Sequence, residues 1–259
     1  MESIYNFSPI EILGFALVLL RVSAFVVTMP VIGTPNVPNQ VKILLALTLT
    51  IIIFPTIGWK QLNYDFETFA IIPHAIKEVF VGLTFGFLTR VFFMTIMMAG
   101  QIMSVSVGIS AAQLYNPMLD EAMSPFDQFY SIVATLFFLA ISGHHLLING
   151  LVETYNMIAI SKMSIDLTAL GGVAGLATTA TKMAVQISAP IMISILMINV
   201  AMALIGRAVP QINILMTSLP VTTLAGLLVM MITMPLLFSE FGDLLGMTTS
   251  QVFDLMRKF

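Results

Sequence analysis

Long runs of apolar residues, separated by short polar or proline-rich stretches, make up most of the sequence. A helix needs about 20 apolar residues to cross the hydrocarbon core of a membrane. Six runs are candidates for such helices: residues 10–30, 41–57, 69–99, 129–152, 183–205 and 212–238. The runs are continuous and do not alternate with a period of two. They therefore predict an all-α polytopic membrane protein and not a β-barrel.

Few of the six runs have the pattern of a simple span. Only 183–205 is clean, and its 23 residues correspond to a helix of about 35 Å. The run from 41 is short, and 69–99 is too long for one simple crossing. The others are interrupted by charged residues, histidines or prolines, such as Arg21 in the first run. Residues 240–259 mix apolar side chains with charged ones, which predicts an amphipathic helix.

Helix-ending signals recur between these runs. Proline, glycine and asparagine gather at residues 30–38, 55–58, 116–125 and 171–175, and each cluster predicts a boundary. Ser124 followed by Pro125 is typical of the entry to a helix.

The composition agrees with a membrane protein and excludes several function classes. Hydrophobic residues make up 58% of the 259 residues and charged ones 9%, and the mean hydropathy is +1.02. Soluble proteins carry roughly 25% charged residues. The ten Lys and Arg are scattered and the net charge is −3, so no nucleic-acid partner is expected. With no cysteine, disulfides and thiolate metal sites are excluded.

Small residues form a ridge near the middle of the chain. Gly100, Ser104, Gly108 and Ala112 recur every four residues, which places them on one face of a helix and lets another helix backbone approach closely. Gly82 and Gly86 form a second, shorter ridge. Two interpretations stay open, namely packing within the chain and an interface with another subunit.

The chain loses its helical pattern after the ridge. Tyr115, Asn116 and Pro117 end the helix, and Asp120 and Glu121 follow. Irregular backbone beside apolar segments is tolerated on the surface, buried in protein or along an aqueous path. The segment is therefore either a solvated turn or a plug that lines a pore.

Two charged residues lie within the run 69–99. Glu78 and Arg90 are twelve residues apart, a little over three helical turns, so they cannot touch on one helix. Charges at membrane depth usually face a bundle interior or a water-filled path. We expect both to be buried charges, each pairing with a group from elsewhere in the molecule.

Nothing in the sequence predicts catalysis or a cofactor. His144 and His145 are adjacent and point about 100° apart on a helix, so they would not hold one metal ion together. The motifs G-x-S-x-G, Walker A and H-E-x-x-H are absent, as are carboxylate pairs placed for acid–base work. We predict a protein that is not an enzyme and binds no metal and no cofactor.

A polar stretch, IGRAVPQINI at residues 205–214, lies between the last two apolar runs. Its notable members are Gly206, Arg207, Pro210, Gln211 and Asn213. In hydrocarbon the charged and amide groups would be costly, and the proline would free a backbone carbonyl. Those costs fall if the stretch is the bend of a helical hairpin packed against other subunits. A polar loop between two spans is the alternative.

Four ordered blocks resemble the FliR family of flagellar biosynthetic proteins. They are LLRVSAFVVTMPVIGTPNVPNQVKILLALTL at 19–49, AGQIMSVSVGISAAQLYNPMLDEAMSPFDQF at 99–129, LFFLAISGHHLLINGLVETY at 136–155, and GRAVPQINILMTSLPVT at 206–222. The sequence departs from the family pattern at Gln101 and Asn116, where a glutamate and an aspartate are common. No role therefore rests on charge at either position.

The resemblance implies a pore-forming subunit of the flagellar type III export gate, located in the bacterial inner membrane at the flagellar basal body. Its fold would consist of bent helical hairpins of the export-gate type, with a P-like half at about 1–165 and a Q-like half at about 166–259. The implied partners are the P-type and Q-type membrane subunits, the B-type export switch protein, the A-type export protein, the lipid membrane and unfolded flagellar substrates in transit.

The family also implies a site. The plug loop that closes the resting gate would consist of Ser110, Ala111, Ala112, Gln113, Leu114, Tyr115, Asn116 and Pro117. Strongly bent hairpins would explain why so few apolar runs are clean, so the six runs are counted as segments and not as spans. A virulence injectisome homologue, a small-solute transporter and a purely structural scaffold remain as alternatives.

Overall fold

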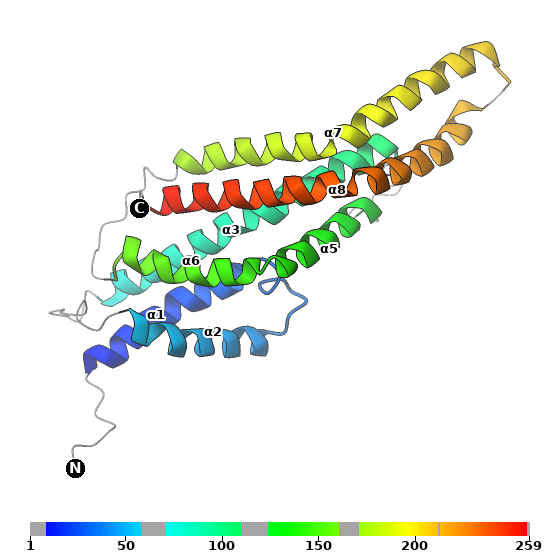
Figure 1. The fold of residues 1–259 in the computed structure, drawn as a ribbon. Coiled ribbons are helices and arrows are strands. Elements are labelled where there is room, and N and C mark those ends of the chain that lie inside the picture. Colours follow the sequence, from blue (N-terminus) through cyan, green and yellow to red (C-terminus); the bar gives the residue numbers. More distant parts are fainter. Residues whose placement is uncertain (1–8, 58–70, 110–123, 161–170, 212, 258–259) are drawn as a thin grey trace. The chain divides into compact units, whose positions relative to one another are not determined.

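The computed structural model describes residues 9–57, 71–109, 124–160, 171–211 and 213–257 (Figure 1). Every regular element in these ranges is a helix, as the apolar pattern predicts. They are α1 (Pro9–Thr28), α2 (Asn39–Ile53), the 3-10 helix η1 (Phe54–Thr56), α3 (Ile71–Val107), α5 (Pro125–Ala140), α6 (Gly143–Met157), α7 (Gly171–Ala208) and α8 (Ile214–Met256). Five helices are long and apolar enough to cross a membrane, and the bent pair α5 and α6 would make a sixth span.

Several predicted boundaries are confirmed. Helices end or begin on either side of 30–38 and at 55–58, and α7 begins at Gly171. The glycines at 171–175, however, form the first turns of α7 and do not end a helix. The run 183–205, expected to be clean, contains Pro190 inside α7. Proline is tolerated within membrane helices because neighbouring groups can satisfy the freed backbone.

The run 129–152 is not one helix. It breaks after α5, where the Ile141 backbone N–H donates to the Phe137 carbonyl at 3.0 Å and Ser142 adopts a left-handed φ of 58°. Gly143 then begins α6. The apolar pattern continues through the break, which is why hydropathy alone misses it.

The amphipathic tail is helical, but it is not a separate helix. It forms the end of α8, which has 43 residues and contains Pro220 and Pro235. Phe241 and Leu244 are buried while Asp243 is exposed, which confirms the amphipathic pattern.

The chain divides into two compact units, each assembled from segments far apart in the sequence. Unit 1 comprises Met1–Val91, Ser142–Ala174 and Thr248–Phe259, and unit 2 comprises Phe92–Ile141 and Gly175–Met247. The expected P-like and Q-like halves concern ancestry along the sequence and stay a prediction. Their boundary falls at 160–180, partly outside the described residues.

Unit 1 is held by close approach between α1 and α3. Gly82 and Gly86 of α3 face the backbone of α1, so closely that a Cβ on Gly82 would strike the Arg21 carbonyl oxygen and one on Gly86 the Thr28 hydroxyl. The rings of Phe25 and Phe85 lie beside these glycines, 5.3 Å apart. The second small-residue ridge therefore packs within the chain.

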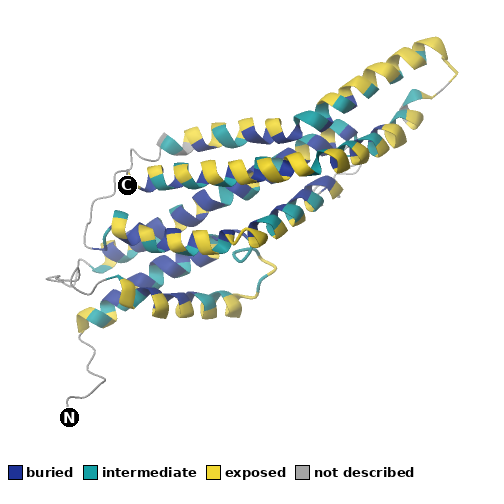
Figure 2. Cartoon of the chain, viewed as in Figure 1, coloured by how far each residue is buried: buried dark blue, intermediate teal, exposed yellow. Residues whose placement is uncertain are grey.

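Unit 2 is held by aromatic contacts. The Phe92 ring lies 6.3 Å from that of Phe138 and 6.5 Å from that of Phe241, and Phe137 stacks on Phe238 at 5.8 Å. These rings join α3, α5 and α8. Much of α7 and α8 remains exposed (Figure 2). In the most apolar 18-residue stretch of each helix, 17% of α7 and 22% of α8 is buried, against 50% of α3.

Candidate functional site

The predicted plug, residues 110–117, lies outside the described residues. The structure does describe the two chain ends between which it lies. Both ends belong to unit 2. The sequence predicted some of the residues that hold them, such as Ser124, but not others, such as Thr222.

The first end is the C-terminus of α3. The helix stops at Val107, and Gly108 turns the chain with a φ of 91°, a conformation that glycine adopts at no steric cost. The Gly108 N–H donates to the carbonyls of Ser104 and Val105, each at 3.1 Å. The Thr222 hydroxyl of α8 donates to the Val107 carbonyl at 2.9 Å.

The second end is the N-terminus of α5, where the predicted entry at Ser124 and Pro125 is confirmed. The Asp127 backbone N–H donates to the Ser124 hydroxyl, and the Ser124 N–H donates to the Asp127 carboxylate, both at 3.3 Å. This reciprocal pair is a capping box, which satisfies two N–H groups that a helix start leaves open. Ser124 and Asp127 are both buried.

The main small-residue ridge is shorter than expected. Gly100 and Ser104 lie on α3 and are buried, Gly108 lies beyond the helix end, and Ala112 lies outside the described residues. A Cβ on Gly100 would lie 3.0 Å from the Asp127 Cα. Gly100 therefore packs against α5 of the same chain, which is the first of the two interpretations left open above.

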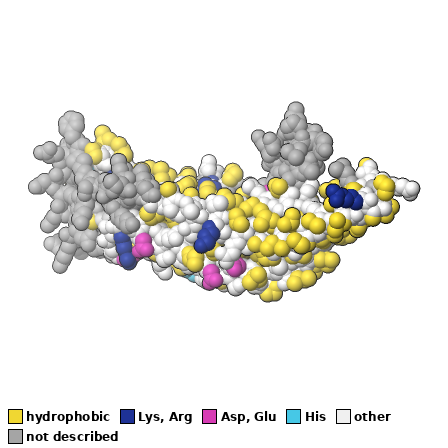
Figure 3. All heavy atoms as spheres, turned by 90° about the horizontal axis from the view of Figure 1, so that it is seen from above, with side chains coloured by type: hydrophobic (Ala, Val, Ile, Leu, Met, Phe, Trp, Pro, Cys, Tyr) yellow, Lys and Arg dark blue, Asp and Glu magenta, His cyan; other side chains and the backbone are white. Residues whose placement is uncertain are grey.

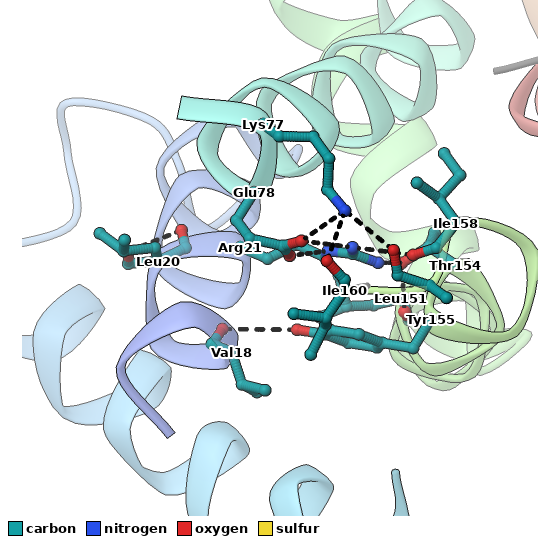
Figure 4. A network of polar contacts seen from close by, with 12 residues as sticks. Val18, Leu20, Arg21, Lys77, Glu78, Leu151, Thr154, Tyr155, Ile158 and Ile160 are labelled. Atoms are coloured by element: carbon teal, nitrogen blue, oxygen red, sulfur yellow. Dashed lines mark hydrogen bonds and ion pairs between the residues drawn. The ribbon is translucent and has the colours of Figure 1, made fainter. Parts of the chain in front are cut away.

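A buried charge network lies in unit 1 (Figure 4). The Arg21 guanidinium of α1 donates to both carboxylate oxygens of Glu78 on α3, at 2.5 and 3.0 Å. Arg21 and Glu78 are completely buried. Bidentate pairing of this kind matches the planar fork of the guanidinium to the carboxylate.

The same network fixes the end of α6. Arg21 also donates to the Ile158 carbonyl at 2.9 Å and the Thr154 hydroxyl at 3.3 Å, and its charge lies 4.1 Å from the centre of the Tyr155 ring. Carbonyls at a helix C-terminus have no partner within the helix, so a cation there is favourable.

Lys77 completes the network. Its ammonium group donates to the carbonyls of Ala159 and Ile160 at 2.8 and 2.9 Å and lies 3.4 Å from the Glu78 carboxylate. One carboxylate thus stands between two cations, and three helices converge on it. Burying such charges is tolerable only with this degree of pairing.

The sequence predicted one member of this ion pair but not the other. It singled out Glu78 and expected a partner from elsewhere, but it treated Arg21 only as an interruption of the first apolar run. The two residues are 57 positions apart, and no periodicity links them. The other candidate, Arg90, is half-buried, and within the described ranges no carboxylate lies at ion-pair distance from it.

The polar stretch at 205–214 connects α7, which ends at Ala208, to α8, which begins at Ile214. Arg207, Pro210 and Gln211 are exposed, and Gly206 faces the Ile214 side chain. The Asn213 side-chain oxygen accepts from the Met216 N–H at 3.3 Å, as an N-cap does. A role in subunit packing stays a prediction.

In the described part of the chain, no group of three or more His, Asp or Glu side chains could hold a metal ion. The His144 and His145 rings lie 4.2 Å apart in the first turn of α6. One face of the described surface is largely apolar and carries few charged side chains (Figure 3).

Known proteins similar to this chain match it along nearly its full length. Residues 12–248 match the family described as "Bacterial export proteins, family 1". The flagellar biosynthetic protein FliR of Bacillus subtilis is 27% identical over 259 residues, covering 99% of this chain and 98% of the relative. Its namesake in Escherichia coli is 28% identical, with 90% and 92% covered. That of Aquifex aeolicus is 25% identical, with 84% and 83% covered.

Proposed function

Since the chain belongs to family 1 of the bacterial export proteins, together with the flagellar FliR proteins, we propose that it is a pore-forming subunit of the flagellar export gate. The observation that carries this proposal is the family match across nearly the full length. The gate would pass unfolded flagellar substrates across the inner membrane, without catalysis by this subunit.

The exposed surface of the last two helices supports a subunit of a larger assembly. With 43 residues, α8 has a length of about 64 Å, roughly twice the hydrocarbon thickness of a membrane. Large apolar side chains are exposed along it, among them Met216, Leu224 and Ile232. Exposed apolar area on this scale requires lipid or protein to cover it. We propose the P-type and Q-type subunits as the protein partners, with the B-type and A-type export proteins as further contacts of the gate.

The segment 110–117 is the proposed plug of the resting gate. Its neighbours support this role, because α3 ends in a glycine turn and α5 begins with a buried capping box. The described chain on either side of residues 110–123 is therefore held by defined contacts.

The test is a deletion of residues 110–117 in cells that express the complete gate. We expect the gate to assemble and the membrane to leak ions. A second variant that replaces the eight residues with glycine and serine keeps the chain length and is expected to leak as well. Unchanged conductance in both variants, with the complex assembled, would refute the plug.

The flagellar system is favoured over a virulence injectisome because the three relatives named above are all flagellar proteins. A knockout is expected to lack hooks and filaments and to stop swimming. Normal motility in the knockout would overturn the flagellar assignment. Solute uptake by the purified chain alone would instead support the transporter alternative.

A further inference from the structure

The two chain ends beside the proposed plug are contacted by one short stretch of α8. Thr222 binds the last carbonyl of α3, that of Val107. One turn further along, Gly226 lies against the Val107 side chain and the Phe126 ring of α5. We propose that Thr222 and Gly226 form a clamp, here named the α8 clamp, that sets the positions of Val107 and Phe126, beside the two described chain ends between which the proposed plug lies. This inference rests on the proposed function.

The hydroxyl group of Thr222 has a specific task. The Val107 carbonyl belongs to the last turn of α3, where carbonyls have no partner within the helix, and Val107 is buried. Thr222 is itself only 4% exposed. Its hydroxyl lies 2.9 Å from the Val107 oxygen and 3.1 Å from the Leu219 carbonyl of its own helix. Without Thr222 the α3 carbonyl would lose this donor, and leaving a buried acceptor unsatisfied is costly.

The absent side chain at Gly226 brings the α8 backbone close to both ends. A Cβ there would lie 2.7 Å from a Val107 methyl carbon and 3.7 Å from the Phe126 ring. Residues four apart lie on the same face of a helix, so the Thr222 hydroxyl and the Gly226 backbone face the same partners. Displacing α8 would therefore move the end of α3 and the start of α5 together.

The opposite side of this stretch is exposed. Leu224 and Leu228 are 64% and 61% exposed, so the inner contacts with α3 and α5 and the outer apolar surface belong to the same turns of α8. The clamp thus makes the positions of Val107 and Phe126 depend on what covers the outer face of α8.

The first experiment compares Thr222→Val with Thr223→Val in the assembled gate. Valine keeps the shape of threonine and removes the hydroxyl. Thr223 donates only to the Leu219 carbonyl of its own helix, at 2.8 Å, so its variant is the matched control. Losing a hydrogen bond to a buried group shifts an equilibrium roughly five-fold or more, so we expect Thr222→Val to raise the ion leak measurably. Thr223→Val should leave the leak unchanged.

The second experiment compares Gly226→Ala with Gly246→Ala. The added methyl group meets Val107 at the first position, whereas nothing lies within 4 Å of it at the second. Both glycines lie in α8, so helix propensity changes equally. A leak in Gly226→Ala alone is expected, with complex assembly measured in parallel to exclude a folding failure.

A distance measurement tests the clamp independently of the plug. The chain has no cysteine, so spin labels can be attached only at introduced cysteines, and Val105 and Gln128 offer exposed positions near the two ends. In the gate complex, the distance distribution between labels at Val105→Cys and Gln128→Cys should broaden with Thr222→Val and not with Thr223→Val. An unchanged distribution with Thr222→Val overturns the clamp.

The outcomes separate the two proposals. If deletion of 110–117 leaks and Thr222→Val does not, the clamp is refuted and the plug stands. If the deletion does not leak, the plug is refuted, and the distance measurement alone decides whether the clamp holds the chain ends.

Discussion

The two compact units solve the problem of packing apolar helices in different ways. Unit 1 places three charged side chains, Arg21, Lys77 and Glu78, in its interior and satisfies them with one another and with carbonyls near the end of α6. The described part of unit 2 has no ion pair. Its helices are joined by phenylalanine rings, the contacts of a capping box, the Thr222 hydroxyl and exposed hydrogen bonds from Gln186 to Glu240.

This difference bears on movement. A buried charge network has one arrangement in which every group is paired, and any other leaves a charge unsatisfied at high cost. Apolar contacts between rings depend less on direction than the paired charges of unit 1 do. A small shift of the helices in unit 2 therefore costs less free energy. We therefore expect unit 1 to resist rearrangement more strongly than unit 2.

The largest effect is expected from Glu78→Gln. It leaves two buried cations without their carboxylate and should lower the stability of the folded chain by about 3–5 kcal/mol. Thermal unfolding of the purified gate complex in detergent measures it. Glu153→Gln, in the exposed part of α6, is the control and should be nearly neutral.

The same network allows a sharper test with a double variant. Arg21→Met and Glu78→Met combined should cost less than the sum of the two single variants, because the double variant leaves only the Lys77 cation without its carboxylate. If the two single effects simply add, the ion pair does not provide the rigidity assigned to unit 1.

A smaller effect is expected from Gly82→Ala. Its methyl group would meet the Arg21 carbonyl and the Ala24 side chain of α1, and such overpacking costs typically about 1–3 kcal/mol. The control Gly246→Ala has nothing within 4 Å and should stabilise the helix slightly. Equal unfolding temperatures for the two variants would show that α1 and α3 do not need this close approach.

In unit 2, Ser124→Ala removes the side chain that caps α5. The expected loss is about 1 kcal/mol, less than for either variant of unit 1, and unfolding of the complex again measures it. Ser239→Ala is the control, since its exposed hydroxyl donates only within α8. A loss as large as that of Glu78→Gln would contradict the contrast between the units.

The smallest effect on the chain itself is expected at the bend. Arg207 and Gln211 are exposed, so changing either to leucine should alter stability by less than about 0.5 kcal/mol. We nevertheless expect both variants to impair gate assembly, measured as the fraction of chain recovered in the complex. Normal assembly of both would show that the bend does not pack against other subunits.

How much the sequence predicts depends on the range of the interactions involved. Local signals were sufficient for the start of α5, where Ser124 and Pro125 belong to one capping motif, and for the boundary between α1 and α2. The break at Ser142 was missed because its apolar flanks continue on both sides. The boundary at 171–175 was predicted correctly, but the glycines begin α7 instead of ending a helix, and composition alone does not separate the two.

Long-range pairing explains the remaining gaps. A buried Glu78 requires a partner, and the sequence states that requirement without identifying Arg21, 57 residues away. Thr222 gave no sequence signal at all, since one threonine in an apolar helix is indistinguishable from the others until Val107 lies beside it. The proposed plug was found only through the resemblance to a family, and spacing could not separate it from a solvated turn.

The most direct test of the central proposal, that this chain is a subunit of the export gate, is co-purification. The full chain carrying an affinity tag is expressed with the P-type and Q-type membrane subunits of the same organism, extracted in mild detergent and separated by size. We predict that the three proteins elute together as one complex of defined mass. Elution of the tagged chain alone, with both partners present and folded, would contradict the proposal.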